Sequence, residues 1–141
     1  MINKKENILI VDDEPDMCWA LACILDRMDF CAQKAFNGEQ ALQLVAQTHF
    51  PMAFLDAKLP DIEGLDLAGQ IRQNDAGVRI FIVSGYFYQN DKEVQRALAQ
   101  GLIVGFVAKP FDHDEIRKAI LDCLSEAPGI ISSSRSAGCR K

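Results

Sequence analysis

The sequence predicts an α/β fold, with five parallel strands in one sheet, helices on both faces and right-handed crossovers between strands. Two observations predict it. Short apolar runs alternate five times with segments whose apolar residues recur at helical spacing. Four of the apolar runs are almost continuous, as expected for strands that are buried on both faces of a parallel sheet.

The first strand covers residues 7–11 and leads into a helix from Pro15 to about Met28, because proline favours the first turn of a helix. Phe30–Ala35 is a weaker apolar run, and we expect it at an edge of the sheet. A second helix opens at Asn37-Gly38. The core-facing residues of these helices follow i, i+3 and i+4 spacing: Met17, Ala20, Leu21, Ile24, Leu25 and Met28, then Ala41, Leu42, Val45 and Ala46.

The next three elements repeat the pattern. Met52–Leu55 is the third strand and Val78–Val83 is the fourth, and Gly64–Gln73 forms the helix between them. That helix presents four apolar residues to the core: Leu65, Leu67, Ala68 and Ile71. A fourth helix follows over Asp91–Gln100, with Val94, Ala97 and Leu98 as its apolar residues.

The fifth strand covers Ile103–Ala108, and Asp112 can cap a final helix because Glu115 completes a capping box three residues later. The inner face of this helix carries Ile116, Ala119, Ile120 and Cys123. The domain therefore covers residues 1–126. Residues 127–141 are rich in serine, and we expect them to be disordered. A truncated linker before an effector domain, a natural tail and a vector remnant all fit this segment.

The charge is unevenly distributed along the chain. Residues 1–126 hold 12 basic and 20 acidic residues, whereas residues 127–141 hold three basic residues and no acidic one. An acidic body without a basic stripe argues against direct nucleic-acid binding by this domain.

The five cysteines are odd in number and form no Cys-x-x-Cys pair, which indicates reduced, buried thiols rather than disulfides or a zinc site. No segment has the ~18 consecutive apolar residues of a membrane span. The apolar run after Lys4-Lys5 is too short for a signal peptide. We therefore expect a cytoplasmic protein without membrane association.

Polar side chains stand where four of the predicted strands end. Asp12 and Asp13 follow the first strand, Asp56 the third, Ser84 the fourth and Lys109 the fifth. Ligand sites of open α/β sheets lie just outside the carboxyl ends of the strands. The sequence therefore predicts that three carboxylates, a hydroxyl and an ammonium meet at one rim.

These groups suit a phosphoryl group bound together with Mg²⁺, which prefers octahedral coordination by oxygen. Asp13 and Asp56 can supply carboxylates to the metal, and Asp12 can bind through water or orient its neighbour. The backbone carbonyl near Lys58 can complete the protein's ligands. Carboxylates this close repel one another, which is a reason to expect a cation, and Lys109 is the counter-charge.

One carboxylate of the rim can act as a nucleophile toward a phosphoryl donor. Asp56 is the best candidate, because it is the single carboxylate that follows the third strand, at the centre of the rim. The Ser84 hydroxyl and the backbone amides of Ala57 and Gly85 would supply hydrogen bonds to the phosphoryl group.

Over residues 6–126 the chain resembles the receiver domains of two-component response regulators. The motifs that carry the resemblance are Ile8-Leu9-Ile10-Val11-Asp12-Asp13-Glu14-Pro15, Leu55-Asp56-Ala57-Lys58-Leu59-Pro60-Asp61-Ile62-Glu63-Gly64, Val83-Ser84-Gly85 and Phe106-Val107-Ala108-Lys109-Pro110-Phe111. Each is weak evidence alone, but all four occur in order and at suitable intervals. The resemblance implies a flavodoxin-like, doubly wound (βα)5 sheet with strand order 2-1-3-4-5.

The resemblance also implies a function. Asp56 would accept a phosphoryl group from a phosphohistidine of a sensor histidine kinase or phosphotransfer protein. Asp12 and Asp13 would form the acidic Mg²⁺ pocket, and Lys109 would contact the phosphoryl group through a segment with a cis bond to Pro110. Such a domain is a phosphoacceptor rather than an enzyme, since it catalyses only its own phosphotransfer and autodephosphorylation.

The resemblance further implies a switch. The Ser84 hydroxyl would follow the phosphoryl group and Phe106 would turn inward, changing the face made by helix 91–100, strand 103–108 and the helix after Asp112. A downstream effector domain or protein would dock on that face, and a homodimer can form through it. The sequence names neither the kinase and its stimulus, nor the output, nor the oligomeric state.

Three features depart from the usual family pattern. The interval from Ser84 to Lys109 is a few residues longer than usual, and Phe106 lacks the hydroxyl of the tyrosine found in many relatives. Lys58 and Tyr86 are bulky residues beside the predicted site, and we expect them to shield the phosphoryl group from water.

Three other functions use some of the same residue types. A degenerate receiver would bind partners without phosphorylation, although every principal site residue is present. A Mg²⁺-dependent phosphatase of the haloacid dehalogenase type would need a second aspartate where Lys58 stands. A flavodoxin-like cofactor binder would need a phosphate-cradling loop where the acidic residues follow the first strand.

Overall fold

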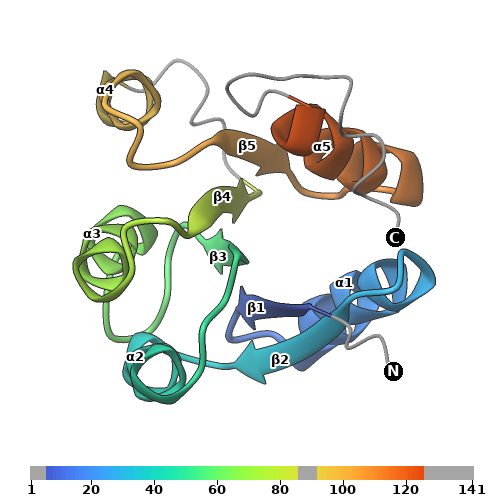
Figure 1. The fold of residues 1–141 in the computed structure, drawn as a ribbon, viewed down its shortest axis with the longest axis horizontal. Helices are drawn as coiled ribbons and strands as arrows, with labels where there is room; N and C mark the ends of the chain where they lie inside the picture. The colour runs from blue at the N-terminus through green and yellow to red at the C-terminus, as the bar shows by residue number, and fades with distance from the viewer. Residues whose placement is uncertain (1–5, 86–91, 126–141) are drawn as a thin grey trace.

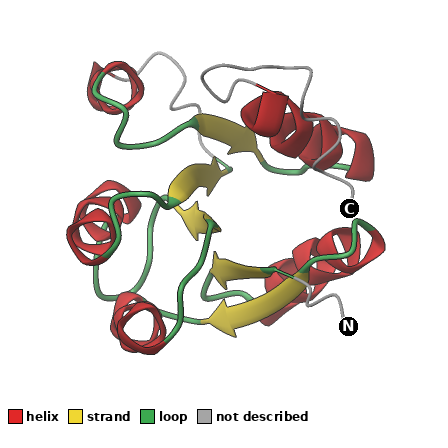
Figure 2. Ribbon diagram, in the orientation of Figure 1, coloured by secondary structure: helices red, strands yellow, loops and turns green. Residues whose placement is uncertain are grey.

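Five parallel strands form one sheet in the order β2-β1-β3-β4-β5, which confirms the predicted fold class and strand order (Figure 1). The structure is a computed structural model and describes residues 6–85 and 92–125. Strand and helix alternate along the chain (Figure 2). In chain order the elements within these ranges are β1 (Asn7–Val11), α1 (Pro15–Arg27), β2 (Cys31–Ala35), α2 (Gly38–Gln47), β3 (Met52–Asp56), α3 (Gly64–Asn74), β4 (Arg79–Ser84), α4 (Lys92–Ala99), β5 (Gly105–Ala108) and α5 (His113–Ser125).

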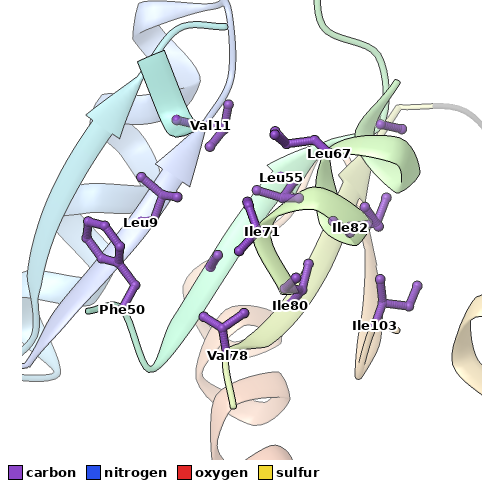
Figure 3. Close-up of a cluster of buried hydrophobic side chains, with 14 of the residues drawn as sticks. Leu9, Val11, Phe50, Leu55, Leu67, Ile71, Val78, Ile80, Ile82 and Ile103 are labelled. Carbon is purple, nitrogen blue, oxygen red and sulfur yellow. The ribbon is translucent and has the colours of Figure 1, made fainter. Parts of the chain in front are cut away.

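The sheet separates two hydrophobic clusters. Helices α1 and α5 cover one face, and α2, α3 and α4 cover the other (Figure 1). Successive strand residues point to opposite faces, so Ile8 and Ile10 pack under α1 while Leu9 and Val11 pack on the α2–α3 side. Figure 3 shows the cluster on the face covered by α2, α3 and α4, in which Leu67 and Ile71 of α3 lie against the strands. Burial on both faces explains why the inner strands read as continuous apolar runs.

Side-chain caps fix the starts of two helices. The side chain of Asn37 accepts a hydrogen bond from the Gln40 amide, 2.8 Å away, at the start of α2. At the start of α5, the Asp112 side chain accepts from the Glu115 amide at 2.9 Å, and the Glu115 side chain accepts from the Asp112 amide at 3.0 Å. This is the capping box that the sequence predicts.

Three predicted strands begin later than expected: β4 starts at Arg79, one residue after the expected Val78, whereas β5 and β2 start late because each follows directly on the end of a helix. Gly101 has φ +78°, and the amides of Leu102 and Ile103 both donate to the carbonyl of Ala97. Residues 102–103 therefore complete the end of α4, although Ile103 is buried, and β5 begins at Gly105. In the same way, Asp29 has φ +70° and the Phe30 amide donates to Leu25, so that β2 begins at Cys31.

Two predicted burials are wrong. Ala46 is exposed on the outer side of α2, where Leu44 is instead partly buried against the core. Cys31 is exposed because it lies on the edge strand β2, whereas Cys18 and Cys123 are buried. The described cysteines are free thiols, as expected. The tail from residue 127 and Tyr86 lie outside the described residues. Among the residues that are described, none of the helices is both long and apolar enough to span a bilayer.

Candidate functional site

Parallel pairing brings the ends of four strands to one rim of the sheet. Val11 of β1 lies opposite Leu55 of β3, and Asp56 lies opposite Val83 of β4. The hydrogen-bond ladder continues into the polar residues, since the Asp12 amide donates to Ala35 at 3.1 Å and the Lys109 amide donates to Ser84 at 2.8 Å. The backbone of the rim is therefore as well fixed as the strands themselves.

Three carboxylates meet at this rim. One oxygen each from Asp12, Asp13 and Asp56 lies within 4.8 Å of the other two. Asp12 is buried, Asp13 is exposed, and only 13% of the Asp56 side chain is exposed. Burial, reinforced by the negative charge of Asp12, raises the pKa of Asp56 to about 6. The predicted concentration of negative charge is present in the structure.

The ammonium of Lys109 lies among these carboxylates. Its Nζ donates to Asp12 Oδ2 at 2.9 Å and to Asp56 Oδ1 at 3.4 Å, and it lies 3.7 Å from Glu14 Oε1. Burial alone would lower the pKa of Lys109, but the hydrogen bond to Asp12 and the surrounding negative charges outweigh it and raise the pKa. Lys109 is therefore a cation at neutral pH. Glu14, whose place at the site is not predicted from the sequence, is a third carboxylate beside Lys109.

Asp12 is also fastened to the start of α1. Its Oδ1 accepts a hydrogen bond from the Glu14 amide at 2.9 Å, and its backbone carbonyl accepts from the Cys18 thiol at 3.3 Å. Burial, followed by the negative charge of Asp12, raises the pKa of the Cys18 thiol to about 11, so the thiol stays protonated and able to donate. The first helix thereby holds the acidic loop in place.

The remaining predicted phosphoryl-binding groups lie around this centre. Ser84 is buried at the end of β4, and Gly85 is exposed beside Lys109, whose Cβ would be 4.0 Å from a Cβ placed on that glycine. The Ala57 amide donates to the carbonyl of Val83 at 3.1 Å. This amide continues the sheet's hydrogen-bond ladder, and its expected bond to a phosphoryl group stays a prediction.

Two further predicted residues lie on β5 and the segment after it. Phe106 is half-buried and packs against the cluster on the α2–α4 side of the sheet. The Lys109-Pro110 peptide bond is cis.

Lys58 lies in the loop between β3 and α3, which is closed on itself. Lys58 and Glu63 form an isolated antiparallel bridge, and their side-chain charges are 3.7 Å apart. The Leu59 amide donates to Ile62 at 3.1 Å, and the Gly64 amide donates to Ala57 at 2.7 Å. More than half of the Lys58 side chain is exposed. Tyr86, its predicted counterpart, lies outside the described residues.

The donor set fits a hard cation. Converging carboxylate oxygens are the ligands that Mg²⁺ prefers. Burial, together with the negative charge of Asp12, raises the pKa of Asp56 even with Lys109 present, and a divalent cation beside the carboxylate would offset both effects. Lys109 and the buried Ser84 add donors for an anionic oxygen. This arrangement can hold a metal ion and a phosphoryl group side by side.

Residues 8–121 match the family model of the response regulator receiver domain. The chain belongs to this family. This match confirms the predicted family. Receiver domains are signalling modules of two-component systems.

Two relatives of this chain carry a receiver domain in proteins of very different length. The chain is 33% identical over 124 residues to sporulation initiation phosphotransferase F of Bacillus subtilis, and the match covers 85% of this chain and 93% of that protein. It is also 33% identical over 120 residues to the response regulator protein PilR of Pseudomonas aeruginosa, but there the match covers 85% of this chain and only 26% of the relative. Receiver domains similar to this one thus occur both nearly alone and within longer regulators.

The solved structures support the same assignment. The response regulator TrrA of Thermotoga maritima, solved in complex with Mg²⁺ and BeF, has a TM-score of 0.73 and 29% identity, covering 84% of this chain and 99% of that one. The chemotaxis response regulator CheY4 of Vibrio cholerae has a TM-score of 0.76 at 19% identity, covering 86% of this chain and all of that one, and shows the shared fold.

Proposed function

We propose that this receiver domain accepts a phosphoryl group on Asp56 from a phosphohistidine of a sensor histidine kinase or phosphotransfer protein. The observation that carries the proposal is the meeting of three carboxylates with the Lys109 ammonium, which contacts Asp12 and Asp56. The transfer forms a bond from an Asp56 oxygen to phosphorus and breaks the bond from phosphorus to the donor imidazole, which leaves with the electron pair. A pKa of about 6 leaves Asp56 largely ionised, and so nucleophilic, at neutral pH.

Asp13 and Asp56 would hold Mg²⁺ directly, together with the backbone carbonyl of Lys58, while Asp12 orients the pocket. When bound, the cation neutralises negative charge on the phosphoryl oxygens. The complex of TrrA with Mg²⁺ and BeF supports this proposal. Lys109 can leave Asp12 for a phosphoryl oxygen, and Ser84 and the Gly85 amide would add hydrogen bonds.

We further propose that phosphorylation acts through Ser84 and Phe106 on the face formed by α4, β5 and α5. A downstream effector domain or protein would dock there, and a homodimer would use the same face. The relatives that extend well beyond the matched region, such as PilR, support an effector domain as one form of output. The acidic body favours protein partners in the cytoplasm over direct contact with nucleic acid.

Intact mass after incubation with Mg²⁺ and acetyl phosphate tests the acceptor. We expect one added phosphoryl group, about 80 Da, on the wild type and none on Asp56→Asn, because only the former has the nucleophile. Asp66→Asn is the matched control, since Asp66 is an exposed aspartate in the first turn of α3. Equal labelling of wild type and Asp56→Asn would place the acceptor elsewhere. No labelling at all, with Mg²⁺ bound, would instead favour a receiver that binds partners without phosphorylation.

A further inference from the structure

We propose that Asp61 is a positioning residue for the metal side of the site, because it fastens the loop between β3 and α3 to the start of α2. This inference rests on the proposed function. Asp61 Oδ1 accepts a hydrogen bond from the Gly38 amide at 2.8 Å, and Oδ2 accepts from the Glu39 amide at 3.0 Å. One carboxylate thus joins two segments that lie more than 20 residues apart in sequence.

The start of α2 needs this carboxylate. The first amides of a helix have no partner within the helix. The Asn37 side chain satisfies the amide of Gln40, whereas Asp61 satisfies the amides of Gly38 and Glu39. The hydrogen bond from Gly38 holds the pKa of Asp61 below its usual value. The positive end of the helix dipole favours the same charged form.

The loop fits tightly between α2 and β3. A Cβ on Gly38 would lie 2.4 Å from Ile62 Cγ2, so only glycine allows this approach of the loop to the helix. At the other end of the loop, a Cβ on Gly64 would lie 2.4 Å from the backbone oxygen of Asp56. A loop packed this closely at both ends has little freedom to shift by itself.

The position of Lys58 therefore depends on Asp61. The hydrogen bond from Leu59 to Ile62 and the bridge from Lys58 to Glu63 close the loop across Asp61. The backbone carbonyl of Lys58 is the proposed metal ligand on this loop. Because a ligand already held in place loses less freedom on binding, the contact with α2 increases the affinity for Mg²⁺.

Calorimetric titration with Mg²⁺ tests the inference on the wild type, Asp61→Ala and Asp61→Asn. Asp61→Ala removes both acceptors, and we expect the Mg²⁺ dissociation constant to rise about tenfold, in the range seen when residues that support metal ligands are changed. Asp61→Asn keeps one carbonyl acceptor, so its Mg²⁺ dissociation constant should lie between those of the wild type and Asp61→Ala. If Asp61→Ala does not fold, Asp61→Asn provides the test. The control is Asp66→Ala, an exposed aspartate without a place in the loop, which should bind Mg²⁺ like the wild type.

Two companion measurements separate positioning from simple stabilisation. Hydrogen exchange should show faster exchange of the Gly38 and Glu39 amides in Asp61→Ala, with or without Mg²⁺. Thermal unfolding should show that Asp61→Ala is less stable than the wild type by a larger margin in Mg²⁺ than in chelator. Equal losses in both forms, with an unchanged dissociation constant, would overturn the inference and leave the proposed function standing. A wild type that does not bind millimolar Mg²⁺ would overturn both.

Discussion

At the scale of single residues, Asp56 is held in surroundings that work against its charge. Its side chain is largely buried, Asp12 and Asp13 lie beside it, and Lys109 compensates only in part. The result is a pKa of about 6, against an ordinary value of 3.8. In the metal-free protein the folded state therefore holds a proton that the unfolded chain releases between about pH 4 and pH 6. Stability from this group falls as pH rises through that window.

Asp56→Asn should stabilise the metal-free protein at neutral pH, because the amide removes the charge that folding buries. We expect a gain of roughly 1–3 kcal/mol in the free energy of unfolding at pH 7.5 and a much smaller gain near pH 4, where Asp56 is protonated in the folded state. Urea unfolding in chelator at the two pH values measures it. Equal stability of variant and wild type at pH 7.5 would contradict the argument that folding buries a charge at this position.

Much of the site followed from one rule applied to the sequence, that polar residues at the ends of parallel strands meet at one rim. The rule placed Asp12, Asp56 and Lys109 together, and the structure shows their contacts. It could not place Glu14 beside Lys109 or Asp61 on α2. Those contacts depend on loop conformation, which leaves no periodic signal in the sequence.

At the scale of elements, the close approach of α3 to the end of β3 sets the shape of the site. Gly64 begins α3, and its amide donates to the carbonyl of Ala57 at 2.7 Å. The three atoms nearest to a Cβ at this position are backbone atoms of Asp56 and Ala57, which cannot turn aside as a flexible side chain can. Helix α3 and the end of β3, which carries Asp56, therefore pack together as one unit.

Gly64→Ala should lower the free energy of unfolding by about 2–3 kcal/mol, since the new methyl group forces the backbone apart. It should also slow the labelling of Asp56 by acetyl phosphate. Gly69→Ala is the matched control on the same helix, because a Cβ there meets nothing within 4 Å. The control should gain up to about 1 kcal/mol from helix propensity. Chemical denaturation of both variants would refute the steric argument if they behaved alike.

The sequence located the elements well, and two of the late strand starts share a cause. Residues 102–103 and Phe30 look like strand in composition, but their amides close the ends of α4 and α1. A buried apolar residue carries the same sequence signal in a strand and in a helix-ending turn. The left-handed residues Asp29 and Gly101 mark the true boundaries.

At the scale of the whole molecule, two helical layers enclose the sheet (Figure 1). Asp12, Asp13, Asp56 and Lys109 converge at one rim of this sheet. If Asp56 is phosphorylated as we propose, the output depends on how long the phosphoryl group survives. The side chain of Lys58 pairs with Glu63 within the loop between β3 and α3, two residues after Asp56. We infer that its bulk restricts the approach of water and gives a long-lived phosphorylated state, suited to a relay intermediate or a slow output.

Lys58→Asn should therefore shorten the half-life of phosphorylated Asp56, by about threefold if one exposed side chain contributes about 0.6 kcal/mol to the barrier. The decay of the phosphorylated mass after removal of donor measures it. Lys118→Asn, on the exposed side of α5, is the control and should decay like the wild type. A variant as long-lived as the wild type would show that Lys58 does not shield the site.

The salt bridge of Lys109 has a mechanical consequence for the sheet. Lys109 follows the border strand β5, yet its ammonium contacts Asp12, the residue that follows β1 in the chain. Two other strands, β4 and β3, lie between β5 and β1 in the sheet. The outermost strand is thus tied to the middle of the molecule by charge as well as by its backbone ladder. If Asp56 is phosphorylated as we propose, the phosphoryl group would lie between Lys109 and Asp12 and compete for the Lys109 ammonium. Phosphorylation of the central strand would then change how firmly the border strand β5 is anchored to β1.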